Sequence, residues 1–348
     1  MQADGLADRS MRANRRSQTE FFGGSWAYGQ PVSLVETDRV TGGGGHNRWM
    51  VLDVALVGTG GMMPLPNRWL SSVLVRYQGR LILFDCGEGT QISLRGLGWG
   101  FKDIGLILIS HVHGDHVTGL PGLLLTLGNS GRTEAVQLVG PAGFREIVEH
   151  LLVVAPHLPF DVHCRELKAG ECFELAGLKI TCGAAEHNVP CLAYRIDVPR
   201  GRRFLPERAR ELGVPIQYWK LLQRGETVAG VEPEAVLGPP RRGLAVGLVT
   251  DTRPTDSLVR LVAEVDLLIG EAMYGSDDDQ PRAVQRKHMT FREVARLAAQ
   301  ARAERLVLTH FSPSVVDPEA FAANARELFP ETTVGQDHLT LTLSFRDE

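Results

Sequence analysis

One stretch of the sequence constrains the fold more than any other. His111, His113, Asp115 and His116 follow directly after the apolar run 104–109. Such a run predicts a buried strand, and side chains two residues apart on an extended chain point to the same side. His111 and His113 therefore point together, and the following turn brings Asp115 and His116 toward a second point nearby. Only 11 of the 348 residues are histidine, so this density indicates a metal site rather than a chance cluster.

Composition bounds the class of protein. With 43% hydrophobic and 22% charged residues, the chain can fill one large core or two ordinary ones. The five cysteines are scattered and form no C-x-x-C pair, which indicates neither a disulfide framework nor a zinc ribbon and fits a reducing compartment. No apolar run reaches about 18 residues and no signal sequence is recognisable, so we expect a cytoplasmic protein without a membrane segment.

The first 49 residues differ in composition from the rest of the chain. Residues 1–49 are polar and end in a run of glycines, which predicts a disordered N-terminal extension. Met50 stands directly before the first strand-like run and is a candidate start of translation. Residues 50–348 read as strands followed by strands that alternate with helices, which predicts one α/β domain.

Apolar runs and turn residues predict the elements of this domain. We expect strands at 51–57, 72–77, 81–84, 104–109, 136–139, 178–182, 191–196, 244–250, 265–271 and 306–311, the second and third forming a hairpin. We expect helices at 91–97, at 117–127 with an interruption at Pro121, at 141–152 with a proline in its first turn, and at 291–303. Thr290 and Glu293 form a capping box at the last of these.

Several expected strands end in polar residues. Asp85, His187, Asp251, Glu271 and His310 all stand at such ends. Taken alone, His187 is more often a loop residue than a ligand, and Asp85 fits a helix cap as well as a support for a metal ligand. The G-x-G-G run after the first strand has no helix behind it, so a tight turn at the rim of the site fits better than a nucleotide loop.

These features together resemble a known family. The H-x-H-x-D-H run, the later histidines and aspartate, and F-D-C-G-E-G-T-Q at 84–91 are similar to the metallo-β-lactamase superfamily. Within it, segments 116–124, 193–196, 237–243, 251–254 and 308–312 resemble the ribonuclease Z family, the tRNA 3′-processing endonucleases. The resemblance covers about residues 51–345. It implies an αββα sandwich, two packed sheets with helices outside, from which a basic arm protrudes.

The resemblance also implies a site with two zinc ions per subunit. His111, His113 and His187 would hold one ion, and Asp115, His116 and His310 the other. Asp251 would bridge them. Imidazole and carboxylate ligands suit Zn²⁺, although they also accept Mn²⁺ or Fe. Asp115 would be the catalytic proton acceptor, and His288, which matches a histidine of the family's His-Ser-Thr segment, is a second candidate catalytic residue.

The chain departs from the family pattern in two places. Gly270 stands where a histidine usually precedes Glu-Ala-Thr, and Pro313-Ser314-Val315 replaces an arginine-containing sequence after His310. Both losses favour an alternative function, a dinuclear-metal phosphodiesterase that acts on a small or cyclic phosphodiester. A non-catalytic RNA-binding protein is a third alternative, against which the complete ligand set argues.

Residues 198–242 resemble the tRNA-binding arm of the family. This segment has nine basic and five acidic residues within a chain of net charge -4, so its cations can position an RNA backbone. We name Arg202, Arg203, Lys220 and Arg224 as candidate substrate-binding residues; an ordinary solvated helical hairpin is the alternative interpretation. The leading hypothesis is therefore removal of 3′ trailers from precursor tRNA, leaving a 3′-hydroxyl, by an enzyme that forms a homodimer as its relatives commonly do.

Overall fold

Two β-sheets organise residues 51–346, the part of the chain that the structure, a computed structural model, describes. The predicted disorder of residues 1–49 and the candidate start at Met50 lie outside this range. The first sheet has the strand order β14 (Thr340–Ser344), β1 (Val51–Gly58), β2 (Ser72–Tyr77), β3 (Arg80–Phe84), β4 (Ile104–Leu108), β5 (Val136–Gly140) and β6 (Val162–Glu166). The second has the order β13 (Thr332–Val334), β12 (Leu306–Thr309), β11 (Leu267–Glu271), β10 (Leu244–Val249), β9 (Cys191–Val198), β8 (Leu178–Ala185) and β7 (Cys172–Leu175).

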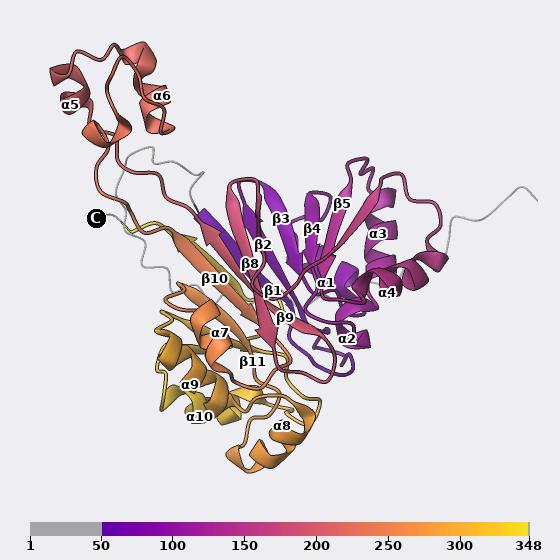
Figure 1. The fold of residues 1–348 in the computed structure, drawn as a ribbon. Coiled ribbons are helices and arrows are strands. Elements are labelled where there is room, and N and C mark those ends of the chain that lie inside the picture. Colours follow the sequence, from indigo (N-terminus) through magenta and orange to yellow (C-terminus); the bar gives the residue numbers. More distant parts are fainter. Residues whose placement is uncertain (1–50, 347–348) are drawn as a thin grey trace, which may run out of the picture. The chain divides into compact units, whose positions relative to one another are not determined.

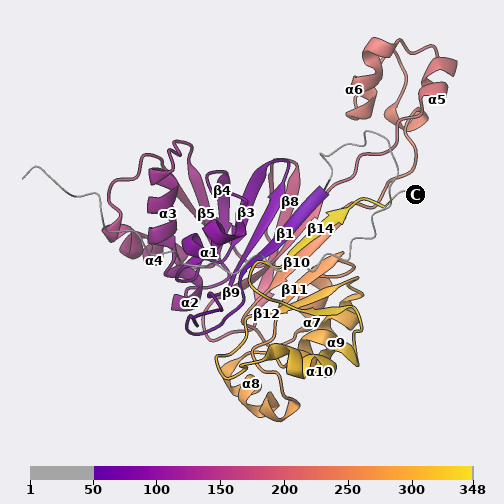
Figure 2. The ribbon, with the colours of Figure 1, turned by 180° about the vertical axis from the view of Figure 1, so that it is seen from behind.

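The sheets pack face to face because their strands alternate apolar side chains between two cores. In β1, Leu52, Val54 and Leu56 enter a core shared with the second sheet, whereas Val57 enters the core beneath the outer helices. In β10, Leu244, Val246 and Leu248 likewise enter the shared core. The αββα sandwich implied by the resemblance is therefore confirmed (Figures 1 and 2).

Helices cover the outer face of each sheet. Those packed on the first sheet are α1 (Thr90–Leu97), α2 (Gly114–Val117), α3 (Leu120–Asn129) and α4 (Phe144–Leu151). Those packed on the second are α7 (Asp256–Leu261), α9 (Phe291–Ala301) and α10 (Ala322–Arg326), and α8 (Gln280–Arg286) lies between β11 and α9 in the sequence. The expected capping box is present at the start of α9, with Thr290 and Glu293 each accepting a backbone hydrogen bond. Among the described residues, none of the helices combines the length and the hydrophobicity needed to cross a membrane.

The prediction of one helix at 117–127, interrupted at Pro121, is wrong. The chain forms α2 and α3 instead, with the break at Thr118 and Gly119. Pro121 lies in the first turn of α3, where its missing N–H costs nothing, rather than inside a helix. The helix expected at 141–152 begins only at Phe144, because Gly143 has a left-handed φ of 85°.

The segment between β9 and β10 holds the expected arm, which keeps its boundaries of 198–242 here. It contains two short helices, α5 (Pro206–Glu211) and α6 (Trp219–Gln223), and a small apolar cluster of its own that includes Ala209, Leu222 and Val236. Phe204 pairs with Leu237 at its base. Figures 1 and 2 show both helices standing apart from the two sheets.

Candidate metal centre

The polar residues of the site follow the carboxyl ends of strands that pair in parallel. β3 pairs with β4, and β10 pairs with β11, which pairs with β12. Carboxyl ends of parallel strands lie at one edge of each sheet, and these edges of the two sheets adjoin, since Asp251 after β10 lies 3.5 Å from His111 after β4. The loop between β8 and β9 adds His187. All seven metal ligands that the resemblance implies gather at this place, in two groups of donor atoms.

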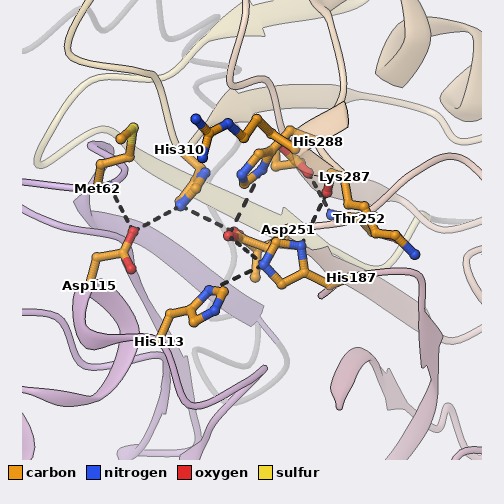
Figure 3. Close-up of polar contacts among 12 residues, drawn as sticks. Met62, His113, Asp115, His187, Asp251, Thr252, Lys287, His288 and His310 are labelled. Atoms are coloured by element: carbon orange, nitrogen blue, oxygen red, sulfur yellow. Dashed lines mark hydrogen bonds and ion pairs between the residues drawn. The ribbon is translucent and has the colours of Figure 1, made fainter. Parts of the chain in front are cut away.

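The first group consists of three imidazoles and one carboxylate oxygen. His111 Nε2 lies 2.9 Å from His113 Nδ1, which lies 3.2 Å from His187 Nε2. Oδ2 of Asp251 lies 3.5 Å from His111 Nε2 and 3.7 Å from His187 Nε2. Figure 3 shows His113 and His187 directed toward the Asp251 carboxylate.

The second group lies on the other side of the same carboxylate. His116 Nε2 lies 3.2 Å from His310 Nε2, and Oδ2 of Asp115 lies 3.5 Å from each of them. Oδ1 of Asp251 lies 3.4 Å from His116 Nε2 and 3.1 Å from His310 Nε2. One buried carboxylate therefore presents one oxygen to each group.

These separations fit a bound cation. Ligands about 2.1 Å from a tetrahedral ion lie about 3.4 Å from one another. Without a cation, one nitrogen of each close imidazole pair must donate to the other, and His113 Nδ1 faces two imidazole nitrogens at once. Burial and the neighbouring His116 hold the pKa of His111 well below its ordinary value, which favours the neutral, ligating form. Burial raises the pKa of Asp251, but the imidazoles of His310 and His116 hold it well below its ordinary value. These residues can bind metal ions.

Asp85 holds His116 and Ser110, the residue before His111, by hydrogen bonds. Its Oδ1 accepts a hydrogen bond from the Ser110 backbone N–H at 2.7 Å, and its Oδ2 accepts one from the Ser110 hydroxyl at 2.8 Å. Oδ2 also lies 2.8 Å from Nδ1 of His116, which leaves His116 Nε2 to face the second group. Asp85 does not cap α1, whose N-cap residue is Gly89.

Three residues of the site have strained backbones, and glycine makes room for one of them. Asp85, Asp251 and His310 have φ angles of 57°, 41° and 61°. A Cβ on Gly61 would lie 2.7 Å from Cε1 of His310, so only glycine fits there. The next residue, Met62, donates its backbone N–H to Oδ2 of Asp115 at 2.7 Å. The glycine turn thus lies at the rim of the site, as expected, but no side-chain signal in the sequence could reveal the Met62 contact.

His288 reaches the site. Its Nδ1 lies 3.2 Å from Oε2 of Glu271 and 3.9 Å from Oδ2 of Asp251, and it can join Asp251 and His310 as a third group of ligand atoms. Burial lowers the pKa of His288, but the carboxylates of Glu271 and Asp251 outweigh it and raise the pKa to about 9. Figure 3 shows His288 beside His310, on the side of Asp251 away from His113.

The structure shows that Gly270, one of the two departures from the family pattern, does not deprive the site of an imidazole. A Cβ on Gly270 would lie 2.6 Å from Cγ2 of Val294 in α9, so a side chain at this position points into the packing between β11 and α9. A histidine at position 270 would not reach the ligands on this backbone. The imidazole beside Glu271 comes from His288 instead.

The four candidate substrate-binding residues lie in the arm, apart from the metal centre. Arg202 is engaged within the arm, where its guanidinium donates to the carbonyls of Gly238 and Leu237. Arg203, Lys220 and Arg224 are exposed. Within residues 51–346, no side-chain hydrogen bond or ion pair involves Lys220 or Arg224.

Known proteins that resemble the chain identify its family. The model of one family, described as "Anti-Pycsar protein Apyc1", matches residues 52–189. A ribonuclease Z of Clostridium kluyveri is 45% identical over 303 residues, which cover 85% of this chain and 100% of that protein. The chain belongs to the ribonuclease Z family. A ribonuclease Z of Lachnoclostridium phytofermentans is 44% identical over 300 residues, covering 85% of this chain and 99% of that protein.

One solved structure agrees with membership of the ribonuclease Z family, and a second agrees with the fold. The short form of human tRNase Z is 26% identical with a TM-score of 0.61, and the match covers 84% of this chain and 98% of that one. The metallo-β-lactamase fold protein YhfI of Bacillus subtilis has a TM-score of 0.63 at 20% identity, covering 84% of this chain and 99% of that one. The second likeness bears on the fold alone.

Proposed function

We propose that this member of the ribonuclease Z family is a zinc-dependent endoribonuclease that removes the 3′ trailer of precursor tRNA and leaves a 3′-hydroxyl on the tRNA. One observation carries the proposal: the buried Asp251 carboxylate faces two groups of ligand atoms. Two cations about 3.5–4 Å apart are the arrangement that many phosphodiester hydrolases use. The name of the human neighbour, tRNase Z, supports tRNA as the substrate.

The proposed cofactors are two zinc ions per chain. His111, His113 and His187 would hold one, Asp115, His116 and His310 the other, and Asp251 would contact both. When bound, such cations lower the pKa of a water molecule toward about 7 and offset the charge that develops on the phosphate oxygens. Since Mn²⁺ and Fe accept the same ligands, metal analysis of protein purified without added metal decides between them.

Asp115 is the proposed proton acceptor. Its Oδ2 faces His116 and His310 and accepts the Met62 N–H, and its side chain is 12% exposed, so the carboxylate borders both the ligands and solvent. Burial raises the pKa of Asp115, but hydrogen bonds from His116 and His310 hold it well below its ordinary value and keep the carboxylate ionised. A carboxylate so placed can orient the attacking water and accept its proton.

His288 is the proposed proton donor to the leaving 3′ oxygen. A group with a pKa of about 9 carries its proton at neutral pH, and Glu271 holds this imidazole beside Asp251 and His310. General acids of this kind contribute on the order of 10²–10⁴ in rate. The balance is complete, because Asp115 takes the proton of the water and His288 gives one to the departing oxygen.

The arm is the proposed contact with the body of the tRNA. Arg203, Lys220 and Arg224 are exposed and can neutralise phosphates without reading bases. Arg202 is better placed to hold the base of the arm, since its donors are engaged by Gly238 and Leu237. We further propose a cytoplasmic homodimer in which the arm of one subunit holds tRNA for the site of the other; light scattering tests the dimer.

A dinuclear phosphodiesterase that acts on small or cyclic phosphodiesters is the second candidate. It is favoured by Pro313-Ser314-Val315, where the family arginine is missing and Val315 is buried. The deciding experiment incubates zinc-loaded protein with a precursor tRNA and, separately, with bis(p-nitrophenyl) phosphate, with His111→Ala as the inactive control. Metal-dependent cleavage after the discriminator nucleotide supports the endoribonuclease. Turnover of the small diester alone supports the second candidate, and tRNA binding without any cleavage supports an RNA-binding protein.

A further inference from the structure

The three residues Asp251-Thr252-Arg253 touch several parts of the site at once. The Thr252 backbone N–H donates to Oε1 of Glu271 at 2.6 Å, and the Arg253 N–H donates to the carbonyl of Glu186, directly before His187. The Arg253 side chain is the longest of the three and is 13% exposed. It extends the contacts of the end of β10 to residues 35 and 40 positions further along the chain.

The Arg253 guanidinium donates hydrogen bonds to two residues, His288 and Glu293. Nη1 donates to the backbone carbonyl of His288, and the same nitrogen donates to Oε2 of Glu293 at 2.9 Å. Nη2 pairs with Oε1 of Glu293. The guanidinium thus joins the end of β10, the His288 backbone and the first turn of α9.

His288 belongs to no helix or strand. It follows Lys287, which has a left-handed φ of 59° and ends α8. Two carbonyls of this turn are engaged from the site: Lys287 O lies 3.2 Å from Nδ1 of His187, and His288 O accepts from Arg253. The backbone of His288 is held at its carbonyl by Arg253 and at its N–H by the carbonyl of Ala283, 2.9 Å away, and its imidazole is held by Glu271.

We propose that Arg253 is a positioning residue for His288, holding the backbone so that the imidazole stays against Glu271 and Asp251. This inference rests on the proposed function, because the effect on rate is exerted through the proton donor. The hydrogen bonds of the Arg253 side chain go to the His288 carbonyl and to Glu293, and to none of the ligand atoms of the two metal groups.

A purely structural role for Arg253 is the competing interpretation. Glu293 already completes the capping box of α9 by accepting the Thr290 N–H at 3.0 Å, and Arg253 neutralises its buried carboxylate. Burial raises the pKa of Glu293, but the hydrogen bond from Arg253 lowers it below its ordinary value. The contact with the His288 carbonyl is not needed for either purpose, which is why it can be tested separately.

The variants are chosen so that no buried carboxylate is left unpaired; E293Q leaves the Arg253 guanidinium without its carboxylate but with the His288 carbonyl as an acceptor. E293Q keeps an oxygen for the Thr290 N–H and leaves Arg253 on the His288 carbonyl. The pair variant R253M/E293Q removes the contact with His288 as well, without isolating a buried carboxylate. R195M/D197N is the matched control, since Arg195 and Asp197 form a 2.8 Å ion pair on β9 that is also partly buried.

Each variant is made with and without H288A, and the single-turnover cleavage rate, the affinity for precursor tRNA and the zinc content are measured. We expect R253M/E293Q to lower the rate about 10–100-fold in the wild-type background and less than about threefold in the H288A background, because residues that act as a unit are not additive. Affinity and zinc content should be unchanged. E293Q and R195M/D197N should stay within about threefold of wild type.

Three outcomes overturn the inference. An equal loss in both backgrounds means that Arg253 acts independently of His288. Loss of zinc in R253M/E293Q means that it acts through His187 and the turn carbonyl of Lys287. An unchanged rate means that the contact between Arg253 and the His288 carbonyl does not contribute to catalysis.

Amide hydrogen exchange tests the positioning even if precursor tRNA is not the substrate. We expect faster exchange across residues 286–290 in R253M/E293Q and not in E293Q. Wild-type protein that cleaves no precursor tRNA would defeat the proposed function alone, whereas unchanged exchange in R253M/E293Q would defeat the positioning role.

Discussion

Asp85→Asn is the substitution whose effect can be worked out most fully. The amide oxygen must stay opposite the Ser110 backbone N–H, which Oδ1 of Asp85 now accepts at 2.7 Å. The amide NH₂ then replaces Oδ2, which lies 2.8 Å from Nδ1 of His116. Two donors would face each other, so the His116 proton must move to Nε2. That nitrogen is the one that faces His310 and Asp251.

The expected loss falls on one metal only. Changes in the partners that orient metal ligands typically cost about 10–100-fold in metal affinity, which corresponds to about 1.4–2.7 kcal/mol. This loss should appear at the group of Asp115, His116 and His310. The group around His111 and His113 should keep its affinity, because the Ser110 hydroxyl oxygen can accept both the new amide N–H and a proton from Nδ1 of His111.

Competition with a chelator measures the two zinc affinities in wild type and in Asp85→Asn. Activity should fall at limiting zinc and return with excess zinc. Asp266→Asn is the matched control, since Asp266 is also buried and accepts a backbone N–H, from Ala245, away from the site. The reasoning is refuted if Asp85→Asn leaves both affinities unchanged or lowers them equally.

Three further predictions concern the rim of the site, stability and the arm. Gly61→Ala should displace His310 and lower the cleavage rate at least about tenfold with little change in Tm. A normal rate would mean that the glycine turn can shift and make room for the added methyl group. A lowered pKa for Glu293 stabilises the fold above the unfolded value of about 4.5, and this stability is lost as pH falls through the folded pKa. Urea unfolding of wild type and Glu293→Gln should therefore differ at pH 7 and converge at low pH; a constant difference would contradict this. Replacing Lys220 and Arg224 with alanine should weaken precursor tRNA binding and reduce its salt dependence by about one for each cation, while hydrolysis of bis(p-nitrophenyl) phosphate stays normal. Unchanged RNA binding would remove these residues from the interface.

The residues at the strand ends could be predicted because buried strands carry strong local signals. The run 104–109 is apolar throughout, and a strand buried on both faces must end where polar residues begin. The capping box at Thr290 is equally local, since both of its partners lie within four residues. Strands β6 and β7 were not predicted, because they lie at sheet edges and are largely half-buried or exposed, which leaves little apolar pattern.

Contacts between distant segments could not be predicted from the sequence. Whether position 270 or position 288 supplies the imidazole depends on which face of β11 meets α9, and on a left-handed turn at Lys287. Arg253 and Glu293 are 40 residues apart, and nothing in either neighbourhood marks them as partners. The engagement of Arg202 within the arm likewise depends on the fold of residues 198–242.

The metal centre itself is tested most directly by X-ray diffraction at the zinc absorption edge from crystals of zinc-loaded protein. We expect two anomalous peaks per chain about 3.5–4 Å apart, with the Asp251 carboxylate between them. One peak would belong to the His111 group and the other to the His116 group. A single peak, or zinc held without Asp251, would contradict the bridged two-metal site on which the proposed function depends.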